Sequence, residues 1–107
     1  MNRDLTLVFS SYQSQNLLKK ILKRFHNKYK TIIIENSCDK KIKIFLENKF
    51  NNTEVIIPKK NLGLAKSYNL GIKKAKTKFI FLNSLTRNCL FSSYIFFISS
   101  SVNFLFL

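Results

Sequence analysis

The sequence predicts an α/β fold with a mostly parallel sheet and helices on both of its faces. Four short runs of apolar, strand-forming residues, at 5–9, 31–34, 53–57 and 79–82, alternate with three segments whose apolar residues recur at helical spacing. This alternation is typical of β-α-β units, in which right-handed crossovers join parallel strands. The strand runs are apolar throughout, as expected for a sheet that is buried on both faces.

Each of the three helices has a signal of its own. Ser14 is a good N-cap for the first, where apolar residues at 17–25 fall on one face and lysines on the other; we interpret the lysines as a solvated face. Asp39 is expected to cap the second helix. The third is expected at about residues 65–76, with Leu70 pointing inward.

Composition excludes several classes of protein. Two cysteines and one histidine are too few for a disulfide scaffold, a zinc knuckle or a His-based catalytic triad. The sequence contains neither G-x-G-x-x-G after its first strand run nor G-x-x-x-x-G-K-[ST], which disfavours a dinucleotide-binding Rossmann domain and a P-loop NTPase.

The net charge of +14 on 107 residues favours anionic partners. Lysine supplies nearly all of the positive charge, whereas arginine, which makes the geometrically specific contacts to bases and phosphates, occurs three times. We therefore expect no sequence-specific nucleic-acid reader. A non-catalytic basic module that binds RNA or an anionic membrane remains the alternative to an enzyme.

The ends of the strand runs are where a ligand is expected, because open parallel sheets bind ligands beyond the carboxyl ends of their strands. Tyr12 follows the first run and would stack on a nucleobase; otherwise it is an amphipathic boundary residue. Glu35 follows the second and would accept hydrogen bonds from a base or a ribose hydroxyl; otherwise it is a solvated loop carboxylate.

Three motifs carry a resemblance to a known family. They are Leu7-Val-Phe-Ser-Ser-Tyr-Gln13, Ile33-Ile-Glu-Asn-Ser-Cys-Asp39 and Asn61-Leu-Gly-Leu-Ala-Lys-Ser-Tyr-Asn-Leu-Gly-Ile72, the last followed by Phe79-Ile-Phe-Leu-Asn83. In this order, the motifs resemble those of family 2 glycosyltransferases, written V-V-I-P-T-Y-N, V-V-D-N-A-S-T-D and N-x-G-x-a-x-a-x-N-x-G-I. The resemblance covers residues 5–83.

The resemblance implies a Rossmann-like GT-A fold, here incomplete, and transfer of a sugar from a nucleotide-diphosphate sugar to an acceptor hydroxyl on a glycan or a lipid-linked sugar. It implies that Ser10, Ser11 and Tyr12 line the base and ribose pocket, with Glu35 in place of the family's base-contacting aspartate. The other donor-site positions that it implies are Asn61, Gly63, Asn69 and Asn83, with Lys66 at the diphosphate. For Gly63 and Gly71, backbone geometry alone is the favoured role.

The chain departs from the family in two ways. The family's fourth strand runs into an aspartate that helps hold Mg²⁺ or Mn²⁺ on the diphosphate, whereas this chain has Leu85 at that position, which cannot ligate a metal. The family's catalytic base lies in a second half that has no counterpart here. We therefore expect a donor-binding part with no catalytic residue and little or no activity of its own.

The chain divides by charge into residues 1–84 and an apolar tail at 85–107, since no charged residue follows Arg87. We expect the tail to be irregular or a hydrophobic helix. One hypothesis is that a frameshift replaced the native sequence after Ser84; a membrane anchor and a non-functional fragment are the alternatives. We expect a cytoplasmic location, or one at the inner face of the membrane.

Overall fold

A computed structural model describes residues 3–97, which form one five-stranded sheet with three helices. The strand order is β3-β2-β1-β4-β5; the first four strands are parallel, and β5 is antiparallel to β4. In chain order the elements are β1 (Leu5–Tyr12), α1 (Gln15–Phe25), β2 (Lys30–Glu35), α2 (Lys40–Lys49), β3 (Thr53–Ile56), α3 (Gly63–Lys74), β4 (Phe79–Thr86) and β5 (Cys89–Phe97). The α/β class and the mostly parallel sheet are thus confirmed.

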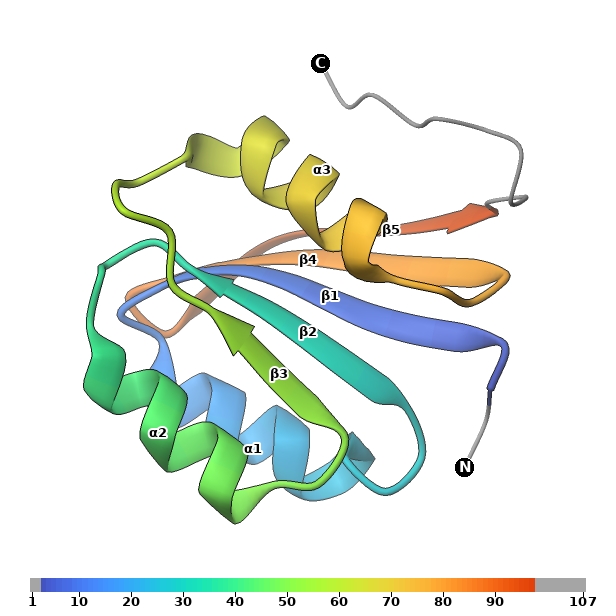
Figure 1. Cartoon of the computed structure of the whole chain (residues 1–107), viewed down its shortest axis with the longest axis horizontal. Coiled ribbons are helices and arrows are strands. Elements are labelled where there is room, and N and C mark those ends of the chain that lie inside the picture. Colours follow the sequence, from blue (N-terminus) through green and yellow to red (C-terminus); the bar gives the residue numbers. More distant parts are fainter. Residues whose placement is uncertain (1–2, 98–107) are drawn as a thin grey trace.

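The helices cover both faces of the sheet, with α1 and α2 on one face and α3 on the other (Figure 1). Each face has its own apolar core. The larger one joins α1 and α2 to Leu7, Phe9 and Leu85, and the smaller one joins α3 to Val8 and its neighbours on β2 and β4. Successive residues of β1 point to opposite faces of the sheet, which explains why its continuous apolar run fills both cores.

Two strands extend further than their apolar runs. β1 continues through Ser10 and Ser11 to Tyr12, and β4 continues through Asn83 to Thr86, because the two strands pair with each other over this whole length. Asn83, the residue that follows the fourth apolar run in the sequence, is therefore not at the end of its strand. Asn83 is buried within β4, and the polar residues pair as well as the apolar ones since the ladder uses backbone groups.

Helix α3 lies two residues earlier than the interval predicted from the sequence. It begins at Gly63 and ends at Lys74, after which Ala75 is extended. Its buried residues are Ser67, Tyr68, Gly71 and Ile72, whereas Leu70 is only half-buried. A fully buried tyrosine and two small residues thus form the contact with the sheet, a pattern that apolar spacing does not reveal.

The start of the predicted tail is a strand, so the expectation of an irregular or helical tail is wrong for residues 89–97. Thr86 pairs with Cys89 across a two-residue turn, and β5 returns along β4 as the sheet's outer strand. The rest of the predicted tail, 98–107, lies outside the described residues. Among the helices of residues 3–97, none is long and apolar enough to cross a membrane.

A carboxylate ties α2 to β3. Glu47 accepts hydrogen bonds from the Val55 N–H at 2.8 Å and from Lys43 Nζ at 2.9 Å. Partial burial would raise the pKa of Glu47, but the Val55 hydrogen bond and the Lys43 ammonium outweigh it, so this pKa lies below its ordinary value of 4.5. The ionised form of Glu47 is therefore the one that stabilises the contact between α2 and β3.

Candidate functional site

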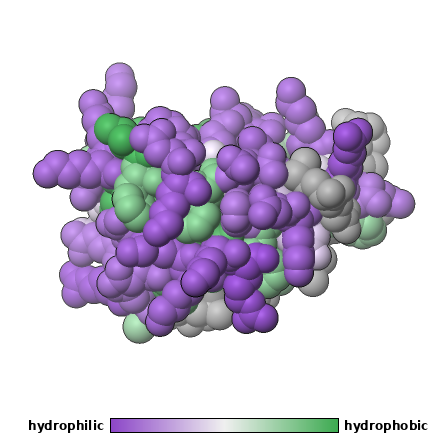
Figure 2. Space-filling model, turned by 90° about the horizontal axis from the view of Figure 1, so that it is seen from below, coloured by the Kyte–Doolittle hydropathy of each residue, from purple (hydrophilic) through white to green (hydrophobic). Residues whose placement is uncertain are grey.

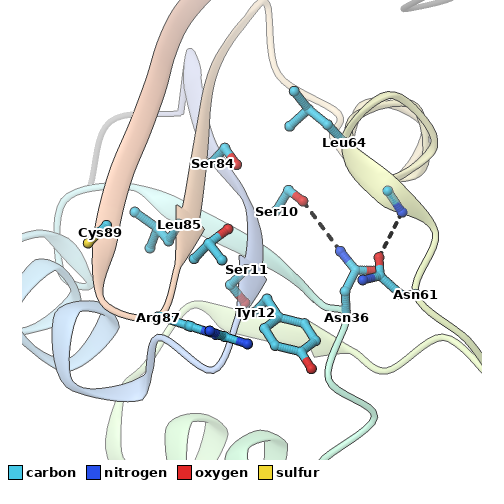
Figure 3. A pocket seen from close by; sticks show the side chains of 12 residues that line it. Ser10, Ser11, Tyr12, Asn36, Asn61, Leu64, Ser84, Leu85, Arg87 and Cys89 are labelled. Carbon is cyan, nitrogen blue, oxygen red and sulfur yellow. Dashed lines mark hydrogen bonds between the residues drawn. The ribbon is translucent and has the colours of Figure 1, made fainter.

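A cavity of about 620 Å³ opens at the carboxyl ends of β1 and β4 (Figure 3). The chain winds from β1 to β2 and β3 on one side and then crosses to β4 on the other, so the cavity lies where the strand order reverses. This is the place where open α/β sheets bind ligands, and the volume suits a small-molecule site. The cavity is lined by Ser10, Ser11, Tyr12, Asn36, Asn61, Gly63, Leu64, Ser84, Leu85, Thr86, Arg87 and Cys89.

The end of β1 is held by a buried carboxylate. Glu35 is fully buried, and its oxygens accept hydrogen bonds from Ser11 Oγ at 2.6 Å and from the N–H groups of Gln13 and Ser37, each at 3.2 Å. Gln13 has a φ of 50°, so its hydrogen bond also fixes a left-handed turn between β1 and α1. Glu35 thus lies behind the cavity wall and positions Ser11, which reaches the cavity.

Asn36 connects the sheet to the start of α3. Its Nδ2 donates to Ser67 Oγ at 2.9 Å and to Ser10 Oγ at 3.4 Å, and its Oδ1 accepts from the Leu62 N–H at 3.0 Å. The side chain is almost completely buried, yet it forms part of the cavity wall (Figure 3). Asn36 thus fixes the distance between β1 and the N-terminus of α3.

The N-terminus of α3 opens into the cavity. Asn61 Oδ1 accepts from the Gly63 N–H at 2.9 Å, and Gly63 has a φ of +77°, which a residue with a Cβ adopts only with strain. The N-cap position, Leu62, provides no side-chain cap. The N–H groups of Leu64 and Ala65 have no acceptor within the helix, and the helix dipole makes this end favourable for an anion.

The turn after β4 supplies the cation of the site. Arg87 and Asn88 have φ values of 49° and 64°, as a two-residue hairpin turn of type I′ requires. The Arg87 N–H donates to the Tyr12 carbonyl at 2.8 Å, and the Arg87 side chain lies beside the Tyr12 ring at the cavity mouth (Figure 3). Both an aromatic residue and an arginine thus line the cavity where β1 and β4 end.

The same turn caps α1. Ser14 occupies the predicted N-cap position, but its side chain donates to the Tyr12 carbonyl and accepts from the Asn88 N–H at 3.1 Å. Asn88 Oδ1 in turn accepts from the Leu17 N–H, also at 3.1 Å. The first turn of α1 is therefore capped from the β4–β5 turn, 71 residues away in the sequence.

The structure brings together five of the nine site residues that the resemblance implies: Ser10, Ser11, Tyr12, Asn61 and Gly63 line the cavity. Glu35 lies behind it, and Lys66, Asn69 and Asn83 are outside its lining. Four further lining residues, Asn36, Ser84, Arg87 and Cys89, were not predicted from the sequence. Asn36 directly follows a strand, which is a signal for a site residue, whereas the other three belong to or follow the part of β4 that the apolar pattern did not reveal.

The cavity does not fit the divalent cation that the resemblance implies. Its oxygen donors are hydroxyls and amides, and no carboxylate is among the described residues that line it. Within residues 3–97, no group of three or more His, Cys, Asp or Glu side chains could hold a metal ion. Mg²⁺ and Mn²⁺ are bound in proteins chiefly through carboxylates, and Arg87 already places a positive charge at the cavity mouth.

Comparison with known proteins found no family model that matches this chain and no curated protein that is similar to it.

Proposed function

We propose that this chain binds a nucleoside diphosphate, free or as its sugar conjugate, in the cavity at the ends of β1 and β4. In this proposal it acts as the donor-binding part of a family 2-like glycosyltransferase and does not transfer the sugar alone. The observation that carries the proposal is the cavity itself, in which Tyr12, Arg87 and the N-terminus of α3 meet where the strand order reverses. The three motifs of the resemblance add independent support.

The cavity residues divide into groups suited to the two ends of such a ligand. Tyr12 would stack on the base, and the hydroxyls of Ser10 and Ser11 would bind the ribose. Arg87 and the N–H groups in the first turn of α3 would bind the diphosphate, because a guanidinium forms paired, charge-assisted hydrogen bonds with phosphate oxygens. Glu35 and Asn36 position these groups.

Binding without a divalent cation follows from this arrangement. A nucleoside diphosphate needs positive charge to offset its phosphates, and no carboxylate of the described cavity lining would hold a metal there. Arg87 and the dipole of α3 supply the positive charge instead. We therefore expect that UDP and dTDP, and their sugar conjugates, bind equally well in EDTA and in Mg²⁺ or Mn²⁺.

Titration calorimetry of the purified chain with these nucleotides tests the proposal. Arg87→Ala should weaken binding about tenfold or more, since a hydrogen bond to a charged group contributes about 1.5–3 kcal/mol. Arg3→Ala is the matched control: it removes the same charge at an exposed position before β1, at the opposite end of that strand, and should leave the affinity unchanged. Absence of binding with and without metal would contradict the proposed function. Binding that needs metal would contradict the role of Arg87.

The two free cysteines provide a second measurement that reports on the place of binding. Cys89 is exposed and lines the cavity, whereas Cys38 is exposed outside it, near the carbonyls of Pro58 and Lys59. In Cys38→Ser, nucleotide should slow the reaction of Cys89 with a thiol reagent; in Cys89→Ser, the reaction of Cys38 should not change. Equal protection of both thiols would indicate binding elsewhere.

The absence of transfer is tested separately. The chain, supplied with UDP- or dTDP-sugars and with metal, should release no nucleotide above the background rate, because no carboxylate of the described cavity lining serves as a general base. Turnover of any of these sugars would refute this part of the proposal while leaving the binding site intact.

A further inference from the structure

A groove with a strong positive charge lies between α1 and α2, on the face of the sheet opposite α3. It has a volume of about 540 Å³ and is lined by Asn16, Lys19, Lys20, Lys23, Lys49 and Phe50. Four lysines therefore line one groove, and in the described part of the chain none of these four lysines is in an ion pair. Lysines that only form a solvated face of one helix would not be expected to line a groove together with a lysine from a second helix.

An apolar hollow adjoins this groove on α2 and shares Lys49 with it. It is lined by Lys41, Ile44, Phe45, Asn48 and Lys49. Ile44 is 61% exposed, the largest exposure among the large apolar side chains of the described residues. Seen from the side of α1 and α2, the molecule shows an apolar patch surrounded by hydrophilic side chains (Figure 2).

Aromatic rings hold two of the lysines in place. Lys19 Nζ and Lys49 Nζ lie 5.3 and 5.4 Å from the centroid of the Phe45 ring, and Lys49 Nζ lies 5.8 Å from that of Phe50. These are cation–π distances, so the ring faces orient the ammonium groups without neutralising them. The charges therefore remain available to an external anion.

We propose that α1 and α2 form a docking face for an anionic phospholipid membrane. The lysines of the groove would bind the headgroup phosphates, and Ile44 would enter the boundary between headgroups and acyl chains. This proposal is independent of nucleotide binding, because the groove and the nucleotide cavity share no lining residue, and α1 and α2 cover the face of the sheet opposite α3 (Figure 1).

The chemistry of the face favours lipid over RNA. Single-stranded nucleic acids are bound by aromatic rings that are free to stack with bases, and often by arginine. Here Phe45 is only half-buried but has lysine over it, Phe50 is buried, and the most exposed apolar side chain is aliphatic. Contact with an acyl chain removes the apolar surface of an exposed isoleucine from water, which is favourable, whereas a base offers no such gain.

Vesicle co-sedimentation of the full chain tests the proposal, with vesicles of phosphatidylcholine alone and with about one third phosphatidylserine, at low ionic strength. Binding should require the anionic lipid and weaken with salt. Each lysine near the membrane surface is worth about a fivefold change in partitioning, so the triple variant of Lys19, Lys23 and Lys49 to Gln should bind about 100-fold less. Ile44→Ser should bind several-fold less.

Helix α3 provides matched controls. Lys66, Lys73 and Lys74 are exposed there, and Leu64 is 42% exposed. The triple variant of these lysines to Gln removes the same net charge, and Leu64→Ser removes a similar apolar side chain; both should retain binding within about threefold. Circular dichroism and the urea midpoint would establish that each variant is folded.

Three results would overturn the proposal. One is an equal loss of binding in the α1–α2 and α3 variants, which would indicate general charge attraction. Another is binding that none of these variants weakens, which would place the membrane contact outside this face. The third is that a homopolymeric RNA, at equal phosphate concentration, displaces the native chain from anionic vesicles but does not displace the α1–α2 variant.

Discussion

Replacing Gly71 by alanine should loosen the packing of α3 on the sheet. A Cβ at Gly71 would lie 2.3 Å from Val8 Cγ1 and 3.4 Å from both Val8 Cβ and Val8 Cγ2. Carbon atoms in van der Waals contact are about 3.5–4.0 Å apart, so the closest pair overlaps by more than about 1 Å. Val8 is fully buried, pairs with Ile32 and Leu82 on the two adjacent strands, and has the restricted rotamers of a β-branched side chain.

The expected loss of stability is the difference between two effects. Adding a methyl group to a tightly packed core costs about 1–3 kcal/mol, and the stiff, central Val8 places the cost at the upper end of this range. Alanine regains about 1 kcal/mol relative to glycine because of its higher helix propensity. We therefore expect Gly71→Ala to lower the free energy of unfolding by about 2 kcal/mol, which corresponds to about 8 °C in Tm for a domain of this size.

Urea unfolding followed by circular dichroism measures this difference, and a double-mutant cycle identifies its cause. Val8→Ala should relieve the clash, so Gly71→Ala and Val8→Ala should be coupled by at least about 1 kcal/mol. Gly63→Ala is the control: nothing lies within 4 Å of its Cβ position, but its φ of +77° should cost about 1 kcal/mol, independently of Val8. If Gly71→Ala stabilised the chain, as helix propensity alone predicts, the close packing of α3 on β1 would be refuted.

Three further perturbations test the site and its supports. Asn36→Ala should lower the free energy of unfolding by about 2–3 kcal/mol and weaken nucleotide binding, because it leaves the Leu62 N–H without its acceptor. Urea titration and calorimetry would measure the two losses. Unchanged stability would contradict the role of Asn36. The folded-state pKa of Glu47 is lowered, so its contribution is present above the ordinary value of 4.5 and is lost as the pH falls through the folded value. Glu47→Gln should therefore be about 0.5–1 kcal/mol less stable than the native chain at pH 7, and this difference should shrink in thermal scans as the pH falls below 4.5. A difference that stays constant with pH would refute the charge effect. Asn88→Ala should cost about 1 kcal/mol in thermal unfolding through loss of the cap of α1, whereas Asn88→Asp should retain most of that stability; equal losses would exclude the cap as the cause.

The spacing of apolar residues predicted the elements of the fold whose apolar side chains are buried in the cores. The four parallel strands and three helices follow from it because every apolar run contributes buried residues to one or both of the two cores. The cap at Asp39 was equally readable, and its carboxylate accepts from the Lys41 N–H at 2.9 Å. At Ser14 the sequence position was right, but the hydrogen bond to the helix comes from Asn88, which local sequence cannot reveal.

The β4–β5 hairpin was not predictable because its turn has no sequence signal. Type I′ turns usually contain Asn-Gly or Asp-Gly, since both central residues need positive φ, whereas here Arg87 occupies the first of these positions. Because no turn was recognised in the sequence, the uncharged residues that follow Arg87 were interpreted as a tail. The ends of β1 and β4 were missed for a related reason: Ser10, Ser11 and Ser84 extend the strands by backbone pairing while their side chains reach the cavity.

The charge of the cavity depends on the same hairpin, and Leu85, which cannot ligate a metal, also has a role in the core. Leu85 is fully buried in the core beneath α1 and α2, where an aspartate would carry an uncompensated charge at a cost of several kcal/mol. Two residues later the chain places Arg87 next to Tyr12 in the cavity wall, and the N-terminus of α3 directs its positive dipole into the same cavity. A cavity with a guanidinium at its mouth and no carboxylate among its described lining residues repels a divalent cation and attracts a polyanion. Leu85 and Arg87 therefore both support the proposed binding of a diphosphate without metal.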